Sequence, residues 1–395
     1  MRARILPLRE RPDLIAVAPA GAFLWTRGGD GVAAWGEARR IDPGTGPERF
    51  ERAARELAAF FGSLDVEGPG HPVAVGSFTF DPRSEGSFVV VPEIAVVSRG
   101  GEAAAIVVGE AEVPDLDLQP VTRGPEKVRY AGSTVSELDW LEAVATATTT
   151  IEEGELDKVV LARDLLVRAD GDIDLARLAA RLAVRFPECF TFVAEGLVGA
   201  TPELLVRTEE RSVESLVLAG SAPRGPGGED ERLGRALLDS EKDASEHAIA
   251  VESVRAVLSP ITKELFVDET PRLLKLANVQ HLATPIRGTL AEDRSALEIA
   301  GLLHPTAAVC GTPRRAAFDF IRRQEGMDRG RYAGPVGWVD AGGDGEWGIA
   351  LRCAQLDGAR GRLFAGAGLV EGSLPERELE ETRVKLRAMQ SVLGD

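Results

Sequence analysis

Short hydrophobic runs, broken by glycine and proline, fill most of the first 110 residues. Runs of about four to eight apolar residues bounded by turn residues are typical of β-strands. Residues 48–64 (ERFERAARELAAFFGSL) differ, because their apolar positions recur at helical spacing. We therefore expect this region to be mainly sheet, with one helix. The expected strands are residues 20–27, 31–36, 71–80, 86–93 and 103–110.

Longer elements follow this region. Residues 136–156 predict a helix, and residues 158–169 (KVVLARDLLVRA) predict a strand directly after it. The polar, proline-containing residues 111–132 are interpreted as a crossing loop. Helices and strands alternate irregularly from Ile173 onward. Strands separated by glycine-rich turns are expected near the C-terminus at residues 332–341, 345–358 and 360–368.

Antiparallel strands at both ends of the chain favour an α+β fold. The most economical arrangement is one large unit of two packed, mostly antiparallel β-sheets surrounded by helices, rather than a doubly wound parallel sheet. We expect residues 1–132 to be the sheet-rich N-terminal part of this unit. Residues 133–395 are expected to form the rest of the same structural domain.

The charge of the chain narrows its possible partners. A formal net charge of -17 repels phosphate backbones and anionic lipid, so binding to nucleic acid or to a membrane is not expected. An anionic ligand would need a locally positive site, made by a metal ion, by Arg or Lys, or by backbone N–H groups. The three cysteines are far apart, and no run of 18 apolar residues occurs. We therefore expect a cytoplasmic protein without disulfides.

The last helix is expected at residues 373–393, where Ser373 and Glu376 have capping-box spacing. Its apolar stripe is Leu379, Thr382, Leu386, Met389 and Leu393, and the adjacent stripe carries Glu378, Glu381 and Lys385. Taken alone, Glu381 and Lys385 are typical of a surface ion pair worth a few tenths of a kcal/mol.

A second turn of carboxylates occurs in residues 237–258, where Asp243 and Glu246 are three residues apart. Two such turns could jointly supply oxygen ligands to Mg²⁺, which takes few ligands from the protein and keeps waters. The alternative is that both are ordinary solvated helix faces. Spacing alone does not choose between the two interpretations.

Ten motifs in series change this balance. They are ELDKVVLARDL (155–165), GATPELLVR (199–207), LAGSAPRG (218–225), KDASEH (242–247), VQHLATPIRGTL (279–290), LHPTAAVCGTPRRAA (303–317), RYAGPVGW (331–338), GIALRCAQL (348–356), FAGAGLVEGS (364–373) and EETRVK (380–385). In this order they resemble the chorismate-binding enzyme family, which includes anthranilate, aminodeoxychorismate, salicylate and isochorismate synthases. The resemblance is strong from Leu138 to the end and weaker before it. It implies that residues 133–395 form the chorismate-binding part.

The resemblance implies a magnesium site. Glu246 and Glu381 would be the metal ligands, and the ring carboxylate of the substrate would complete the coordination. Asp243 and Glu378 lie one helical turn before Glu246 and Glu381, respectively. They would support these two ligands from behind or reach the metal through a water molecule.

A cradle for the substrate's carboxylates is also implied. Arg352, expected on a strand, and Tyr332 would hold the pyruvyl carboxylate. Gly366 and Gly368 would let backbone N–H groups approach an anion, and Lys385 would add positive charge beside the metal. Gly220 and Ser221 of LAGSAPRG complete the expected substrate contacts. Without the resemblance, Arg352 could be a surface residue, Tyr332 a core residue, and the glycines turn formers.

Three positions distinguish members of the family. Lys158 stands where ammonia-using members carry Gln, and a desolvated Lys can act as a general base towards water. Ala308 stands where salicylate-forming and aminating members carry Thr. Arg287 stands where aminodeoxychorismate synthases carry a Lys nucleophile, a role that Arg cannot take because it keeps its proton.

The implied reaction is the Mg²⁺-dependent conversion of chorismate to isochorismate. Lys158 would activate water for attack at C2, and Glu203, in an apolar setting that raises a carboxyl pKa, would protonate the leaving C4 hydroxyl. His281 would donate a hydrogen bond near the ring carboxylate or the leaving group. The other histidines are expected to be structural at His71 and His304, while the role of His247 stays open.

Other activities remain to be weighed against this one. A salicylate synthase would go on to eliminate pyruvate, an aminating enzyme would need a glutaminase subunit, and a silent relative would only bind ligand. Lys158 makes a glutaminase partner unexpected, and the retained acidic and basic residues disfavour a silent relative. The chain is expected to be a monomer or weak dimer. Isochorismate serves both menaquinone and siderophore synthesis, and the sequence does not choose between these pathways.

Overall fold

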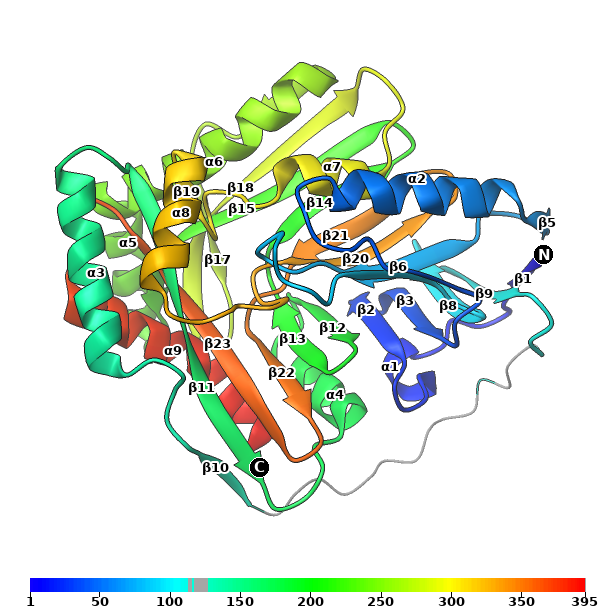
Figure 1. Ribbon diagram of the computed structural model, residues 1–395, viewed down its shortest axis with the longest axis horizontal. Helices are drawn as coiled ribbons and strands as arrows, with labels where there is room; N and C mark the ends of the chain where they lie inside the picture. The colour runs from blue at the N-terminus through cyan, green and yellow to red at the C-terminus, as the bar shows by residue number, and fades with distance from the viewer. Residues whose placement is uncertain (113–115, 117–126, 395) are drawn as a thin grey trace.

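The computed structural model describes residues 1–112, 116 and 127–394 of the chain (Figure 1). Two large β-sheets pack against each other, with helices around them. Within the described residues, the pairings between strands are antiparallel except that of the first and fifth strands. The predicted α+β class, with two packed antiparallel sheets, is therefore confirmed.

The larger sheet contains 13 strands of the described part of the chain. In spatial order they are β10 (Val128–Tyr130), β11 (Lys158–Ala169), β23 (Arg360–Leu369), β22 (Cys353–Asp357), β13 (Leu197–Thr201), β12 (Phe190–Ala194), β2 (Phe23–Arg27), β3 (Asp30–Trp35), β8 (Ile94–Arg99), β9 (Glu102–Val108), β1 (Arg2–Pro7) and β5 (Asp65–Glu67), with β19 (Gly311–Thr312) beside β11.

The smaller sheet contains ten strands of the described part. Their order is β16 (Thr262–Val267), β18 (Val279–Leu290), β15 (Ser212–Pro223), β14 (Leu204–Glu209), β21 (Gly345–Ile349), β20 (Pro335–Asp340), β6 (Val73–Ser77), β7 (Phe88–Val91) and β4 (Arg39–Ile41), with β17 (Arg272–Lys275) beside β18. Strands from before and after residue 132 thus share both sheets.

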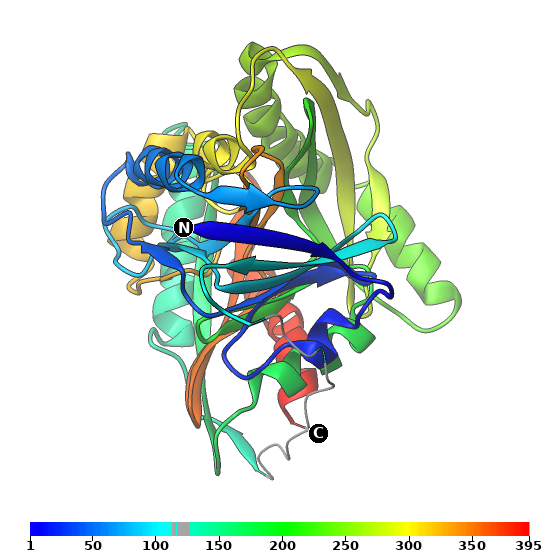
Figure 2. The ribbon, with the colours of Figure 1, turned by 90° about the vertical axis from the view of Figure 1, so that its right-hand side faces the viewer.

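Helices cover the outer faces of the sheets. They are α1 (Leu14–Val17), α2 (Arg49–Gly62), α3 (Glu137–Glu152), α4 (Leu175–Arg185), α5 (Gly228–Leu238), α6 (Glu241–Leu258), α7 (Ala296–Leu303), α8 (Arg314–Gln324) and α9 (Pro375–Leu393), with a 3₁₀ turn at Ser259–Ile261. Helices α2 and α7 lie side by side against the smaller sheet (Figures 1 and 2). Helix α9 packs on β23, beside α3 and α4. No described helix is long and apolar enough to cross a membrane.

Alternation along the strands divides the core into two layers. Trp25 and Phe192 point into the layer between the sheets, while Leu24 and Val193 join the layer under α1, α4 and α9. Successive side chains of a strand point to opposite faces, so a strand buried on both faces reads as a continuous apolar run. For this reason, the short apolar runs of the N-terminal region predict strands.

The expected N-terminal elements are present as β2, β3, β6, β7, β9 and α2. The expected crossing loop at 111–132 contains β10, and its residues 113–115 and 117–126 lie outside the described part. The expected capping box at the last helix is wrong, because α9 begins after Leu374 and the Ser373 hydroxyl accepts from the Val370 N–H instead. The division into 1–132 and 133–395 as parts of one domain stays a prediction.

The expected strand at 345–358 is two strands in different sheets. It splits into β21 in the smaller sheet and β22 in the larger one. Residues 350–352 between them cross from one sheet to the other, and Arg352 has a φ of +49°. This left-handed conformation strains the backbone of a residue that carries a side chain. The chain therefore places a strained arginine at the junction of the two sheets.

Candidate active site

Most of the residues predicted for the site line one small cavity of about 60 Å³ at this junction. The predicted residues on its wall are Glu203, Gly220, Ser221, Glu246, His281, Ala308, Tyr332, Arg352, Gly366, Gly368 and Lys385. The other four, Lys158, Asp243, Glu378 and Glu381, stand behind the wall and contact it or one another. Segments far apart in the sequence thus meet at one point.

Lys158 and Glu246 form a buried ion pair on one side of the cavity. The Lys158 side chain is fully buried at the start of β11, and its Nζ lies 3.0 Å from Glu246 Oε1 of α6. The angles at this contact are not those of a hydrogen bond. Burial raises the pKa of Glu246, but the charges of Lys158 and Lys385 outweigh it, so the pKa lies below its usual value. Glu246 is therefore an anion at neutral pH.

Gly368 lies opposite this pair, at a position where there is no room for a side chain. Gly368 of β23 pairs with Val160 of β11, and a Cβ atom on Gly368 would lie only 2.0 Å from Glu246 Oε1. Any side chain there would displace the carboxylate from the cavity wall. The expected close approach at Gly368 is thus to a carboxylate of the protein itself.

Helix α9 contributes a second carboxylate and a lysine. Lys385 Nζ lies 2.5 Å from Glu381 Oε1 and donates to the Gly366 carbonyl at 2.9 Å. The pair fixes the lysine over β23 and leaves the second oxygen of Glu381 outside these contacts. The interpretation of a plain surface pair is disfavoured, because the Lys385 side chain is only 12% exposed and lines the cavity.

Asp243 and Glu378 are two further carboxyl groups near Glu246 and Glu381. Burial, with the nearby charges of Glu246 and Glu381, raises the pKa of both Asp243 and Glu378. Lys242 partly compensates, with its Nζ 2.6 Å from Glu378 Oε1. Among the described residues, no three His, Cys, Asp or Glu side chains are grouped closely enough to hold a metal ion by themselves.

Glu203 lies on the cavity wall in a different environment. It stands between β13 and β14, is 4% exposed, and its backbone is held by Thr201 and by the Ile349 N–H. Burial raises the pKa of Glu203 to about 8, although Lys158, Arg352 and Lys385 oppose this shift. The side chain is therefore a neutral acid at pH 7 and can donate a proton.

Tyr332 and Arg352 approach the cavity from the same side. The Tyr332 ring stacks on Phe364, with ring centroids 5.0 Å apart. Burial raises the pKa of Tyr332, so its hydroxyl keeps its proton. Arg352 was expected on a strand, which is wrong, because it lies in the crossing between β21 and β22. Its buried Nε has no hydrogen-bond partner among the described residues.

Arg287 is not part of the cavity. It lies on β18 with its side chain 55% exposed, 3.5 Å from Glu214. Arg287 in this position therefore gives no structural support to the exclusion of an aminating enzyme. Two of the histidines outside the site are buried and hydrogen-bonded, His247 to Thr284 and His304 to the Phe80 carbonyl, whereas His71 is exposed. Their bonds fit structural roles.

Sequence reasoning missed a second buried ion pair beneath the cavity. Arg329 Nη2 lies 2.6 Å from Glu325 Oε2 and also donates to the Val160 carbonyl, while Nη1 donates to the Val309 carbonyl. The same Glu325 oxygen accepts from the Ala162 N–H. One guanidinium thus ties the strand of Lys158 to the loop of Ala308. Its i,i+4 spacing just before RYAGPVGW was the available signal, and it resembles a common surface pair.

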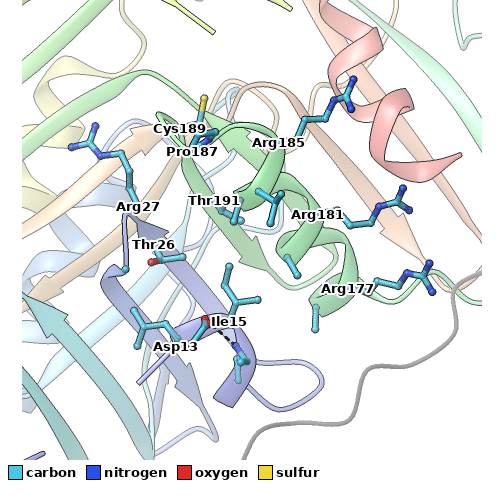
Figure 3. Close-up of a pocket in the computed structure, with 18 of the residues that line it drawn as sticks. Asp13, Ile15, Thr26, Arg27, Arg177, Arg181, Arg185, Pro187, Cys189 and Thr191 are labelled. Atoms are coloured by element: carbon cyan, nitrogen blue, oxygen red, sulfur yellow. Dashed lines mark hydrogen bonds between the residues drawn. The ribbon is translucent and has the colours of Figure 1, made fainter. Parts of the chain in front are cut away.

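A much larger cavity, of about 1380 Å³, lies between α1, β2 and α4 (Figure 3). Arg177, Arg181 and Arg185 lie along one side, and Arg27 stands 3.9 Å over the Phe190 ring on the other. Among the described residues that line this cavity, none was predicted for the site.

Comparison with known proteins shows the family of the chain. Residues 113–394 match the family model described as chorismate binding enzyme, and the chain belongs to this family. The salicylate biosynthesis isochorismate synthase of Pseudomonas aeruginosa is 37% identical over 98% of this chain and 86% of its own. The isochorismate synthase MenF of Bacillus subtilis is 38% identical over 88% of this chain and 81% of its own.

A solved structure gives the same result for the fold. The crystal structure of a DhbC protein from Bacillus anthracis, described as a 2,3-dihydroxybenzoate-specific isochorismate synthase, superposes with a TM-score of 0.82. It is 33% identical, over 96% of this chain and 98% of that one. The resemblance seen in the sequence motifs is therefore confirmed.

Proposed function

We propose that this chain is an isochorismate synthase, an isomerase that moves the hydroxyl of chorismate from C4 to C2. The observation that carries the proposal is a buried acid with a buried lysine nearby. Glu203, neutral at pH 7, lines the cavity, and the fully buried Lys158 stands behind the wall against Glu246. A base and an acid held apart in one site are what an exchange of hydroxyl groups needs.

The residues present fit a magnesium ion. Glu246 and Glu381 offer carboxylate oxygens from two helices, and Mg²⁺ usually takes one or two carboxylates and completes its shell with water and substrate. When bound, the ion supplies positive charge that holds the ring carboxylate of the substrate. Asp243 and Glu378 stand one turn before each ligand and add negative charge that favours a cation.

The protein's own groups then account for the proton movements. Lys158, in the neutral amine form that the reaction requires, accepts a proton from the water that forms the new bond to C2. The ring double bond shifts, the C4–oxygen bond breaks, and Glu203 gives its proton to the departing hydroxyl, which leaves as water. One water enters and one leaves, so the product is an isomer of the substrate. Arg352 and Tyr332 hold the pyruvyl carboxylate during this exchange.

Ala308 favours stopping at isochorismate. It lines the cavity between these groups and offers no hydroxyl for a further reaction. A salicylate synthase is the second candidate, because it shares the same acid and base and would eliminate pyruvate from the same product. Since the relatives carry names from menaquinone, siderophore and salicylate pathways, the pathway served here stays outside the proposal.

Product analysis tests the proposal. The purified protein is incubated with chorismate and Mg²⁺, with and without EDTA, and the products are separated by chromatography while salicylate fluorescence is followed. We expect isochorismate with Mg²⁺, little salicylate, and no turnover in EDTA. Glu203→Gln should lower kcat about 10²–10³-fold, whereas Glu214→Gln, at a half-buried glutamate on β15 outside the cavity, serves as the matched control.

Other outcomes would point elsewhere. Salicylate as the main product of fresh protein would support the second candidate. Product that forms only when ammonia is added would identify an aminating enzyme, and chorismate binding without any product would identify a silent relative. The oligomeric state, predicted as monomer or weak dimer, is measured separately by sedimentation.

A further inference from the structure

His281 lies on β18, directly opposite Ser221 of β15, and both ring nitrogens have partners. Arg352 Nη2 lies 3.0 Å from His281 Nε2. A guanidinium has five N–H donors and no acceptor, so Nε2 must accept this hydrogen bond. The proton of the neutral imidazole is therefore on Nδ1.

The protonated nitrogen is occupied by partners on the neighbouring strand β15. His281 Nδ1 lies 3.2 Å from the Gly220 carbonyl and 2.9 Å from the Ser221 hydroxyl. Gly220 has a φ of +73° and forms a bulge in β15, which brings its carbonyl to this position. A carbonyl can only accept, so the Nδ1–H group donates to it. The ring has no N–H group left to offer a substrate.

Arg352 needs such support. Its backbone is in a strained left-handed conformation, and its Nε is buried without a partner among the described residues. A buried unpaired donor is destabilising, so this arrangement is expected only where a ligand supplies the acceptor. His281 occupies one end of the guanidinium and leaves the Nε end for an anion.

We propose that His281 is a positioning residue: it holds the Arg352 guanidinium through Nε2, orients it for a substrate carboxylate, and transfers no proton in the reaction. This inference rests on the proposed function and replaces the expectation from the sequence that His281 donates to the ring carboxylate or the leaving group. Burial, together with Arg352 and Lys385, lowers the pKa of His281 well below its usual value, which keeps the ring neutral.

Two amide variants separate the roles. In His281→Gln, the side-chain oxygen reaches the position of Nε2 and can accept from Arg352, but the amide cannot carry a proton between groups. In His281→Asn, the amide reaches only the position of Nδ1. We expect the Gln variant to keep kcat and the KM for chorismate within about threefold, and the Asn variant to raise KM at least tenfold with a smaller change in kcat.

The opposite pattern would overturn the inference. If His281→Gln turned over about a hundredfold more slowly than the wild type while KM stayed unchanged, the imidazole itself would be moving a proton. A new pH dependence of turnover in that variant would mean the same. Folding of each variant is checked by circular dichroism and thermal unfolding before kinetics.

A double-mutant cycle provides the second test. Arg352→Met removes the guanidinium, so His281→Asn added to it should change the binding of chorismate by less than twofold. Binding is measured by calorimetry in the Glu203→Gln background, where turnover is slow. Additive losses would show that His281 acts independently of Arg352, and they decide the matter even if the Gln variant does not fold.

The two proposals fail in different ways. If the wild-type protein makes no isochorismate, the proposed function fails whatever His281 does. If the wild-type protein makes isochorismate while His281→Gln loses turnover or the cycle is additive, only the positioning role fails.

Discussion

Glu203 and Glu246 are both glutamates on the wall of one cavity, and burial acts on both, yet their pKa values move in opposite directions. Burial raises the pKa of Glu203 to about 8. At Glu246 burial acts in the same direction, but Lys158 and Lys385 reverse it, and the pKa falls below its usual value. What separates them is a cation 3.0 Å from Glu246 Oε1. Carboxyl groups pushed apart in this way mark acid and ligand roles.

The difference arises from local structure. Glu246 lies on a helix facing the first residue of β11, and Gly368 leaves room for its carboxylate. Glu203 follows Pro202 between two strands of different sheets, where lysine and arginine charges act on it only from a distance. Burial alone therefore does not determine the direction in which the pKa of a carboxyl group moves. The distance to the nearest opposite charge determines it.

The largest effect is expected from removing that counter-charge. Lys158→Ala takes away both the proposed base and the partner of Glu246, and loss of a general base typically costs about 10²–10⁴-fold in rate. We expect kcat to fall by about 10³-fold or more, measured by isochorismate formation. Lys263→Ala, on the exposed strand β16, is the control. Activity within tenfold of wild type would contradict the role of Lys158.

A matched pair of amide substitutions compares the two glutamates directly. Glu203→Gln replaces a neutral acid by a neutral amide that loses no proton on unfolding, so we expect kcat to fall about 10²–10³-fold while stability at pH 7 rises above that of the wild type. Glu246→Gln leaves Lys158 buried without an anion, which costs about 3–5 kcal/mol. Urea unfolding measures both. Equal loss of stability in the two variants would contradict the difference between a neutral Glu203 and an ion-paired Glu246.

The pH dependence of stability gives a third test. The pKa of Glu203 is about 8 in the folded protein and near 4.5 when unfolded. Between these values the unfolded chain has lost a proton that the folded protein keeps, so stability falls as pH rises, by up to about 1.4 kcal/mol per pH unit. Below about pH 4.5 this contribution is fully present, and above about pH 8 it is lost.

The control for this test is the Glu203→Gln variant, which lacks the titrating group. Its stability should exceed that of the wild type increasingly from about pH 5 to about pH 8, in unfolding experiments at fixed ionic strength. The kcat of the wild type should also decline above about pH 8, where Glu203 no longer holds its proton. Parallel stability curves for the two proteins would contradict a neutral Glu203.

The smallest effect is expected at Ala308, which lines the same cavity as the two carboxyl groups. Ala308→Thr adds a hydroxyl that can bond either a carboxyl group or the product. We expect a several-fold increase in the fraction of salicylate formed, with total turnover reduced less than tenfold. Salicylate fluorescence and chromatography measure the ratio. An unchanged ratio, with Ala308→Ser as a smaller hydroxyl variant, would show that this position does not select the product.

Much of the fold and of the candidate site could be predicted from the sequence. Alternation and turn residues located β2, β6 and α2, and the ordered motifs gathered the residues that now share one cavity. The split of residues 345–358 could not be predicted, because GEWGIALRCAQLDG reads as continuous strand and only pairing with two different sheets breaks it. The buried Glu325–Arg329 ion pair could not be predicted for a related reason. Its i,i+4 spacing is the same as that of an exposed pair and does not show that the pair is buried.

The cavity of about 60 Å³ has a consequence for the timing of binding. Pockets for small organic ligands usually measure about 300–1,000 Å³, so this cavity is narrow for a molecule of the size of chorismate. If only a wider form of the protein binds the substrate, the apparent dissociation constant is the intrinsic one divided by the fraction of molecules in that form. Substitutions that loosen the junction of the sheets would speed substrate entry while leaving the acid and base unchanged.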